Sequence, residues 1–504
     1  MMRLSASTAS TARYRQAGLI GLSAAMVLTT VTAFTPRPAA HRALPHLKWK
    51  GTITMFAQSY TPIAPGVKLP KNSPRLTALE TLARQFGRLY PGIHIHFVNP
   101  TFQDTNQQVE TKAAGGTMYD VYFNQYENWN TVFPQGIVYN LAPYFRQPDP
   151  YIAGNKHWAS VMNPKIVAET RAPGGQIYEI NGDYLGIQFF YNKTLFHRAG
   201  IAGPPKTWAA LLADAKKLKA HHIMPGADVP TYDWWVRDFL GNYLGLPTMR
   251  KIAGFSRQPG ISEYDDAIAY AKGILNPAKN PRIMAWWPVV KQLYTYWNKN
   301  ATVIPWNNQP TGAQTGQVLF AAGKVAMVFG GTWVPNTVKF SGGKFPIGSF
   351  PMPVLSRTSK FATGYNSAGD AGGPQAAFQY AISTPKADTS MGQPGKFQAV
   401  LDWLRFIATP KHDQMIVNQL GSFVPTFKGT QPTPALTSVK AQLSRPWYQC
   451  DGGQFLTSAE YTTIRNIFQE YVGGHLSLSA AKTQYARAVS TAYHQFALQH
   501  HLAP

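Results

Sequence analysis

The segment from residue 51 to residue 98 constrains the fold most strongly, because it alternates between strand and helix patterns. Gly51 to Ala57 (GTITMFA) is rich in apolar and β-branched residues and predicts a short strand. Apolar residues then recur at helical spacing from Leu76 to Phe86, and residues 93–98 (IHIHFV) predict a second strand. A strand, a helix and another strand in this order favour a parallel sheet, so the sequence predicts an α/β protein.

The rest of the chain continues this mixture of strands and helices. With about 100 to 200 residues in an ordinary domain, a chain of 504 residues is expected to form two or three domains, and two lobes fit this length. We expect further strands at 119–123, 185–191, 325–329 and 378–382. We expect helices or helical turns at 106–114, 193–199, 208–220, 397–408, 414–420 and 477–499.

The amino terminus has the layout of an export signal. Arg3, Arg13 and Arg15 precede an uncharged, largely apolar stretch at 17–34. This is the pattern of a signal peptide, and its 18 residues are also enough to span a bilayer without cleavage. We therefore assign residues 1–48 to a signal peptide or membrane anchor with its linker, and expect an extracytoplasmic protein, secreted or tethered to the outer face of the cytoplasmic membrane.

The net charge of +24 arises from a shortage of acids: 47 Lys and Arg face only 23 Asp and Glu. The basic residues are not clustered as in a nucleic-acid-binding protein; Lys216-Lys217-Leu218-Lys219 is among the densest runs. An acidic exterior gives a physical reason to lose carboxylates, because protonation removes the ion pairs they form. We interpret the chain as acid-adapted, with compositional drift as the alternative, and expect a melting temperature that varies little from about pH 3 to about pH 6.

Four separated stretches carry a resemblance to a known family. They are Gly186 to Leu218, Phe320 to Pro335 (FAAGKVAMVFGGTWVP), Gly372 to Pro385 and Ala399 to Pro425. Together they resemble, in the same order along the chain, the carbohydrate-type extracellular solute-binding proteins of ABC importers, the group that includes maltose-binding protein. The resemblance implies a two-lobed periplasmic-binding-protein fold with a ligand cleft between the lobes.

The resemblance also implies how the chain is divided and what it does. Lobe one is expected at 49–180 and 345–428, and lobe two at 181–344 and 429–504. The implied function is capture of a sugar or oligosaccharide, without catalysis and without a cofactor, by a monomer that delivers it to the permease subunits of an ABC transporter.

A sugar site needs flat aromatic rings for the C–H faces and polar groups for the hydroxyls. Trp333 follows a strand pattern and is the first candidate for stacking, while Gln58 and Tyr60 come directly after the first strand, where open parallel sheets bind ligands. Core packing, loop capping and turn geometry are the alternative roles for such residues. The full set of predicted ligand-binding residues is Gln58, Tyr60, Asn124, Gln125, Asp183, Tyr232, Trp234, Trp235, Trp333, Asp370, Gly372 and Gly373.

Two other classes of function are weighed against this interpretation. A secreted carbohydrate-active hydrolase needs two carboxylates across the scissile bond, and Glu127 and Asp183 are available, but no spacing singles them out. A binding protein for a non-sugar solute such as glycerol phosphate is the other alternative. The single cysteine, Cys450, and the absence of a His-Glu-x-x-His pattern give no sign of a metal site.

Overall fold

The computed structural model of the chain describes residues 43–69, 73–99, 111–124, 136–171, 175–227, 284, 287–297, 315–353, 372–373, 377–440 and 456–499. Residues His41–Pro504 form one compact unit. Within the described ranges, no helix has both the length and the apolar character needed to cross a membrane. The predicted export signal lies outside these ranges and stays a prediction.

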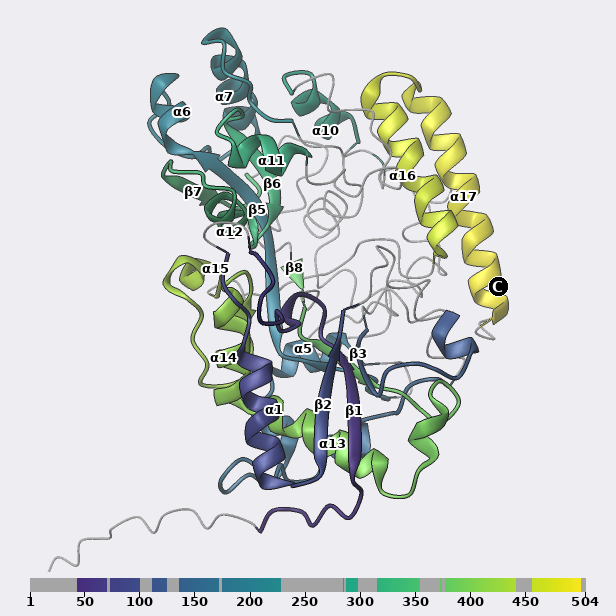
Figure 1. The fold of residues 1–504 in the computed structure, drawn as a ribbon. Coiled ribbons are helices and arrows are strands. Elements are labelled where there is room, and N and C mark those ends of the chain that lie inside the picture. Colours follow the sequence, from purple (N-terminus) through teal and green to yellow (C-terminus); the bar gives the residue numbers. More distant parts are fainter. Residues whose placement is uncertain are drawn as a thin grey trace, which may run out of the picture. The chain divides into compact units, whose positions relative to one another are not determined.

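The first sheet contains the parallel unit that the sequence predicts. Its strand order is β2-β1-β3-β9-β4, with β1 at Gly51–Phe56, β2 at Ile93–Val98, β3 at Val121–Phe123, β9 at Gln379–Ile382 and β4 at Ile180–Asn181. β1 pairs in parallel with β2 and with β3, whereas β9 is antiparallel to both of its neighbours (Figure 1). Helix α1 (Ala78–Leu89) connects β1 to β2. The β-α-β prediction is therefore confirmed.

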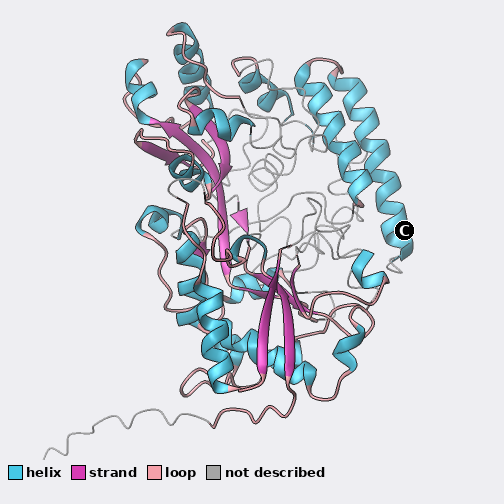
Figure 2. Ribbon diagram, viewed as in Figure 1, coloured by secondary structure: helices cyan, strands magenta, loops and turns pink. Residues whose placement is uncertain are grey.

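Two later helices pack with α1 against this sheet. They are α13 (Lys396–Ile407) and α14 (Pro410–Leu420), and both contact α1 (Figures 1 and 2). The ring of Phe86 in α1 lies 5.4 Å from the rings of both Trp403 and Phe406 in α13. Because each fully buried large apolar side chain contributes roughly 1.5–3 kcal/mol, this contact holds α1 and α13 firmly together.

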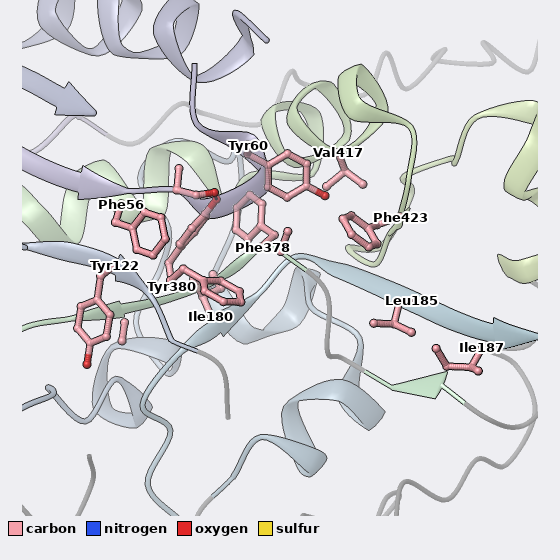
Figure 3. Packing of buried hydrophobic residues seen from close by; sticks show 14 of the residues in the cluster. Phe56, Tyr60, Tyr122, Ile180, Leu185, Ile187, Phe378, Tyr380, Val417 and Phe423 are labelled. Atoms are coloured by element: carbon pink, nitrogen blue, oxygen red, sulfur yellow. Dashed lines mark hydrogen bonds between the residues drawn. The ribbon is translucent and has the colours of Figure 1, made fainter. Parts of the chain in front are cut away.

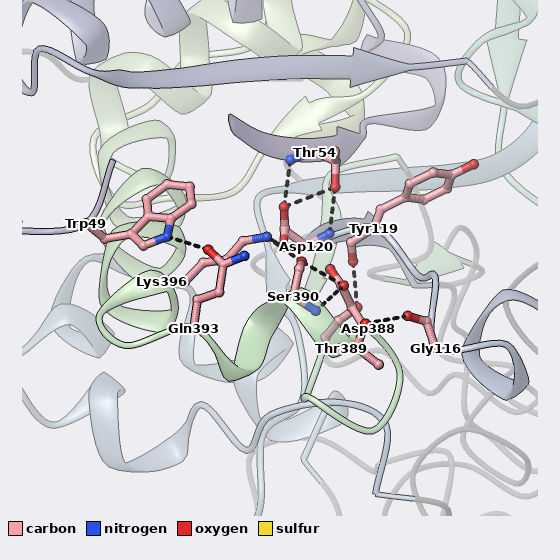
Figure 4. A network of polar contacts seen from close by, with 11 residues as sticks. Trp49, Thr54, Gly116, Tyr119, Asp120, Asp388, Thr389, Ser390, Gln393 and Lys396 are labelled. Atoms are coloured by element: carbon pink, nitrogen blue, oxygen red, sulfur yellow. Dashed lines mark hydrogen bonds and ion pairs between the residues drawn. The ribbon is translucent and has the colours of Figure 1, made fainter. Parts of the chain in front are cut away.

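A buried ion pair also connects α13 to the first sheet. Lys396 Nζ lies 2.7 Å from Oδ1 of Asp120, and both side chains are at most 5% exposed. The other oxygen of Asp120 accepts hydrogen bonds from the backbone N–H and the hydroxyl of Thr54 in β1 (Figure 4). Lys396 also donates to the hydroxyl of Ser390. The network joins β1, the start of β3 and α13.

The second sheet is antiparallel throughout its described pairs. Its central strand is β5 (Asp183–Asn192), and every residue of β5 is buried. The strands that pair with β5 are β6 (Met327–Gly331), β7 (Ile347–Phe350), β8 (Gly372–Gly373) and β10 (Val424–Pro425). β7, β8 and β10 thus belong to the second sheet although they lie in the 345–428 segment assigned to lobe one; the lobe boundaries themselves stay a prediction.

The helices that accompany the second sheet and the carboxy-terminal part begin at recognisable caps. Asn192 and Thr207 cap α6 (Lys193–Arg198) and α7 (Trp208–Ala220), and Thr457 forms a capping box with Glu460 at the start of α16. The other helices here are α10 (Trp287–Tyr294), α11 (Thr315–Ala321), α12 (Val334–Phe340), α16 (Ser458–Gly473) and α17 (Leu478–Gln499). Of the helix expected at 106–114, residues 111–114 are helical and the remainder lies outside the described residues.

The shorter elements complete the described chain. The short α-helices are α4 (Ala142–Phe145), α5 (Pro164–Glu169) and α15 (Thr437–Lys440). The 3-10 helices are η1 (Gln58–Tyr60), η3 (Trp158–Val161), η8 (Thr389–Gly392) and η9 (Pro434–Leu436).

One glycine carries the chain from the first sheet into the second. Gly182 is the single residue between β4 and β5, and its N–H donates to the carbonyl of Phe378 at 2.9 Å. A Cβ at this position would lie 2.3 Å from Oδ1 of Asp413 and 2.5 Å from the ring of Phe378. Close approach of these two side chains therefore requires glycine at the crossover.

Candidate functional site

Three amide side chains form a row across the first sheet. Gln379 pairs directly with Asn181 in the β4–β9 ladder. The backbone N–H of Asn124, immediately after β3, donates to the carbonyl of Gln379 at 2.9 Å. Residues opposite one another in adjacent strands project from the same face, so Asn124, Gln379 and Asn181 are neighbours, and we call them the amide row. Asn124 is a predicted ligand residue, and the other two are not.

Glu179 is the ionisable group at the centre of the amide row. It precedes Asn181 by two residues, which places it on the same face of the strand. Its carboxylate accepts from Nδ2 of Asn124 and Nε2 of Gln379, both at 3.2 Å, and more weakly from Nδ2 of Asn181 at 3.5 Å. The side chain is buried. Burial raises the pKa of Glu179 to about 8, against the opposing effect of the hydrogen bonds from Asn124 and Gln379.

The amide oxygens of the row are left without donors. Oδ1 of Asn124, Oε1 of Gln379 and Oδ1 of Asn181 are all buried, and no hydrogen bond reaches them in the described part of the chain. The hydroxyl of Tyr122, two residues before Asn124, is in the same condition. A buried polar atom without a partner costs about 1–3 kcal/mol. The amide row is therefore a buried cluster of acceptor oxygens, which a group carrying several donors would satisfy.

Tyr60 and Asp183, two predicted ligand residues, contact each other. The hydroxyl of Tyr60 donates to Oδ2 of Asp183 at 2.6 Å, and the N–H groups of Ala377 and Phe378 donate to the same oxygen at 3.1 Å. Both side chains are almost fully buried. Burial raises the pKa of Asp183 to about 7, although these hydrogen bonds act in the opposite direction. In this structure the pair has the geometry of a support for the site.

Trp333 is placed where a flat side chain remains accessible. It is the residue before α12, it is half-buried, and its Nε1 donates to Oε1 of Gln317 at 3.0 Å. Its ring meets the ring of Phe423 edge-on with the centroids 6.3 Å apart. The hydrogen bond to Gln317 and the contact with Phe423 thus help to fix the orientation of a ring that is only partly buried.

Phe423 connects the candidates from the two sheets. Its ring also lies 6.3 Å from the ring of Tyr60, which in turn contacts Phe378 (Figure 3). Tyr60 follows a strand of the first sheet and Trp333 follows a strand of the second, so a shared neighbour links them. The carbonyl of Leu420 accepts from Nδ2 of Asn336 in α12 at 2.7 Å, which holds the segment that carries Phe423.

Gln58 has an unusual backbone conformation. Its φ of +50° lies in the left-handed region, and it is one of two described non-glycine residues with a positive φ. Its side-chain oxygen accepts from the N–H of Ser59, the next residue. A glutamine in this region costs about 1–2 kcal/mol and must be held by its surroundings, here the 3-10 turn that also places Tyr60.

The remaining predicted residues are divided between the sheet and the undescribed ranges. Gly372 and Gly373 form β8 and pair with Gly186 and Leu185 of β5. The other predicted ligand residues, together with Glu127 of the hydrolase alternative and Cys450, lie outside the described residues. The ligand candidates in this group are Gln125, Tyr232, Trp234, Trp235 and Asp370. In the part of the chain that the structure describes, no three metal-ligating side chains gather.

The sequence interpretation missed most of the amide row. Glu179 and Asn181 alternate with Ile180 directly before the crossover, and Gln379 interrupts an apolar strand. Both are signals, because polar residues in buried strands need partners. The sequence pattern did not show that Glu179 and Gln379, which are 200 residues apart in the chain, come together in the sheet.

Comparison with known families identifies one that covers most of the chain. The family model of the bacterial extracellular solute-binding proteins matches residues 71–412. Curated binding proteins of Brucella abortus (strain 2308) and Brucella suis (strain 1330) are each 28% identical to the chain over 142 residues. These matches cover 28% of this chain and 32% of each relative, so the chain spans about a third of the length of these relatives.

Solved structures share the fold over nearly the whole chain. The GacH receptor of Streptomyces glaucescens, solved unliganded and with acarbose, has a TM-score of 0.57 at 18% identity and covers 89% of this chain and 99% of its own. A chitin oligosaccharide binding protein has a TM-score of 0.61 at 18% identity, covering 88% and 99%. Maltose-bound MalE3 of T. maritima has a TM-score of 0.58 at 15% identity, covering 87% and 99%. These likenesses establish a two-lobed solute-binding-protein fold.

Proposed function

This chain belongs to the bacterial extracellular solute-binding proteins, and on that premise we propose that it captures a sugar or oligosaccharide for an ABC importer. The observation that carries the proposal is the amide row with its unpaired oxygens. The three amide oxygens lack hydrogen-bond donors, and a sugar presents several hydroxyl donors on one small molecule. Acarbose, maltose and chitin oligosaccharides, which are ligands of the structural neighbours, belong to this class.

Two kinds of contact would hold the ligand. The amide oxygens of Asn124, Gln379 and Asn181 would accept from sugar hydroxyls, while Glu179 keeps the amides oriented through their N–H groups. Trp333 would stack on the apolar C–H face of a sugar ring, because its ring is only partly buried and its orientation is held by Gln317 and Phe423. Tyr60, Asp183 and Phe423 would support both groups from behind. We place Gln58 at the rim, on the turn that carries Tyr60.

The mechanism is capture between two lobes followed by delivery. Ligand closes the lobes, because contacts from both are complete only in the closed form. The closed monomer then docks on the permease subunits of the transporter. We place the protein outside the cytoplasm, secreted or held at the membrane by its amino-terminal segment, and assign it no catalytic step and no cofactor.

Calorimetric titration of the wild-type protein with acarbose, maltose, raffinose and a chitin oligosaccharide tests this function. At least one is expected to bind with one site per chain. Gln379→Leu removes one amide while keeping similar volume and is expected to weaken that binding by about tenfold or more, the cost of one lost hydrogen bond. Thr81→Val, on a helix of the same sheet outside the row, is the control and should bind like wild type. Binding of glycerol phosphate in place of any saccharide would contradict the sugar assignment.

A further inference from the structure

Asp183 and Asp413 are two buried carboxyls at the crossover between the sheets. Both side chains are 0% exposed. Asp413 is in the first turn of α14, and its Oδ1 packs directly on Gly182, the residue that joins β4 to β5. Asp183 is the next residue along the chain. The two carboxyls therefore flank the one residue through which the chain passes from the first sheet into the second.

Neither carboxyl has a counter-charge among the described residues. In the described ranges no lysine, arginine or histidine lies within ion-pair distance of Asp183 or Asp413. Oδ2 of Asp183 accepts three hydrogen bonds, but neither oxygen of Asp413 has a partner among the described residues. Buried acids elsewhere differ: Asp120 contacts Lys396 at 2.7 Å, and Asp402 lies 3.8 Å from Arg405. A buried unpaired charge is costly, and the group becomes neutral instead.

The titratable groups around the pair are all acids. Tyr60 from η1 donates to Asp183, and Tyr380 from β9 lies close enough for the charges of both carboxyls to act on it. Burial, and next the negative charge of Asp183, raise the pKa of Asp413 well above its usual value. Burial also raises the pKa of Asp183, to about 7. The site thus holds two buried acids, and the described part of the chain places no positive group close enough to pair with them.

We propose that Asp183 and Asp413 form a proton-dependent latch at the crossover, which is closed when both carboxyls are protonated and loosens when they ionise. In acid, the neutral carboxyl of Asp413 packs on Gly182 and Asp183 keeps its three donors. As the pH rises, a proton leaves to solvent and two negative charges would face each other beside Gly182. Repulsion between the two carboxylates, and the favourable hydration that each would gain in water, then favour opening of the crossover. The latch concerns the protein itself and does not depend on which solute it binds.

Hydrogen exchange of the wild-type protein at about pH 5 and about pH 8 tests the latch, after correction for intrinsic exchange rates. Amides at 180–185 and 410–426 should lose protection at the higher pH by at least about tenfold more than those of β1 and β2. Asp413→Asn keeps the shape and cannot ionise, so these segments should be equally protected at both pH values. Asp149→Asn is the matched control: Asp149 is also buried with a raised pKa, but no described contact joins it to the crossover. This variant should keep the wild-type response.

Two outcomes would overturn the latch. One is an Asp413→Asn variant whose crossover responds to pH as strongly as wild type, and the other is a wild-type response spread evenly over all strands. Should Asp413→Asn fail to fold, Asp183→Asn removes the facing charge and should at least halve the response. The infrared carbonyl band of a protonated carboxylic acid gives an independent reading on the wild type. The part of the band that Asp413→Asn removes should be present at about pH 5 and weaker at about pH 8; if the variant removes no part of the band at about pH 5, the proposal is contradicted.

Discussion

The indole ring of Trp333 lies directly over Gly331: a Cβ on this glycine would come 2.1 Å from ring atom Cζ3. Gly331 is the last residue of β6. Any side chain at this position would clash with the ring of Trp333, so the strand must end in glycine for the ring to lie there. Gln317 and Phe423 then hold the ring from its edge. The Gly-Gly-Thr-Trp sequence at 330–333 is thereby explained as the seat of an oriented tryptophan.

Replacing Trp333 or Gly331 tests whether Trp333 stacks on the ligand. Trp333→Ala should weaken binding of the saccharide identified by titration by about tenfold to a hundredfold, because stacking is worth on the order of 1–3 kcal/mol. Gly331→Ala should weaken the same binding by displacing the ring, although it leaves the tryptophan in the sequence. Calorimetry beside an unfolding curve separates this from a core role: a variant that loses about 3–5 kcal/mol of stability but binds normally would place Trp333 in the core.

The buried carboxylate of the amide row predicts a pH dependence of stability. The pKa of Glu179 rises from 4.5 to about 8 on folding, so its contribution to stability is fully present below about pH 4.5 and is lost as the pH rises through about 8. Glu179→Gln cannot ionise and should lose less melting temperature than wild type between about pH 5 and about pH 8. Parallel melting curves of both proteins at the two pH values measure this. Identical losses would show that Glu179 does not titrate in this window.

Asp149 and Asp402 should also make the protein less stable as the pH rises. Burial raises their pKa values to about 7 and about 6, so each adds stability in acid that is lost toward neutral pH. The acid count alone predicts a flat profile from about pH 3 to about pH 6. The raised pKa values of Glu179, Asp149 and Asp402 lead us to a different expectation: stability should decline with rising pH once the usual pKa of the carboxyl is passed.

The ion pair between Lys396 and Asp120 should be important for stability. Lys396→Met leaves Asp120 buried without its cation and should cost about 3–5 kcal/mol. Arg84→Ala removes the exposed pair with Glu80 and should cost less than about 1 kcal/mol. Urea unfolding of the two variants beside wild type measures both values. A similar small cost for both would mean that Asp120 is solvated or protonated when its partner is removed.

Much of the fold could be predicted from the sequence, because apolar residues recur at regular spacing within its longer helices and strands and because local signals such as caps mark where these elements begin. The helix at 208–220 begins where Thr207 caps it, and the strands at 51–56 and 93–98 pair as the β-α-β pattern predicts. The short strands β4, β8 and β10 were not predictable. Each has two residues, too few for a periodic pattern, and exists only through pairing with distant segments.

The candidate site was readable only in part, for a related reason. Position after a strand identified Asn124, Tyr60 and Trp333, but position alone does not tell a ligand contact from a support. Tyr60 proved to donate to Asp183, a contact across 123 residues of sequence. Glu179 and Gln379 join the site through the antiparallel insertion of β9 between β3 and β4, which no local pattern encodes.

Lobe closure gives a test of the mechanism that does not depend on any single residue. Small-angle scattering should show a smaller radius of gyration at saturation with the bound saccharide than without it, because the ligand is expected to complete contacts from both lobes. An unchanged radius at saturation would count against the two-lobed trap while leaving binding itself intact.

The most direct test of the central claim is a thermal melt of the wild-type protein, at about pH 4.5, against acarbose, maltose, raffinose, chitin oligosaccharides and glycerol phosphate. A ligand that binds only the folded protein raises the melting temperature by mass action, with about 2.7 kcal/mol gained at a hundredfold excess over Kd. The account predicts a concentration-dependent rise of several degrees with at least one saccharide and none with glycerol phosphate. A panel in which no saccharide shifts the melt, or in which only glycerol phosphate does, would contradict it.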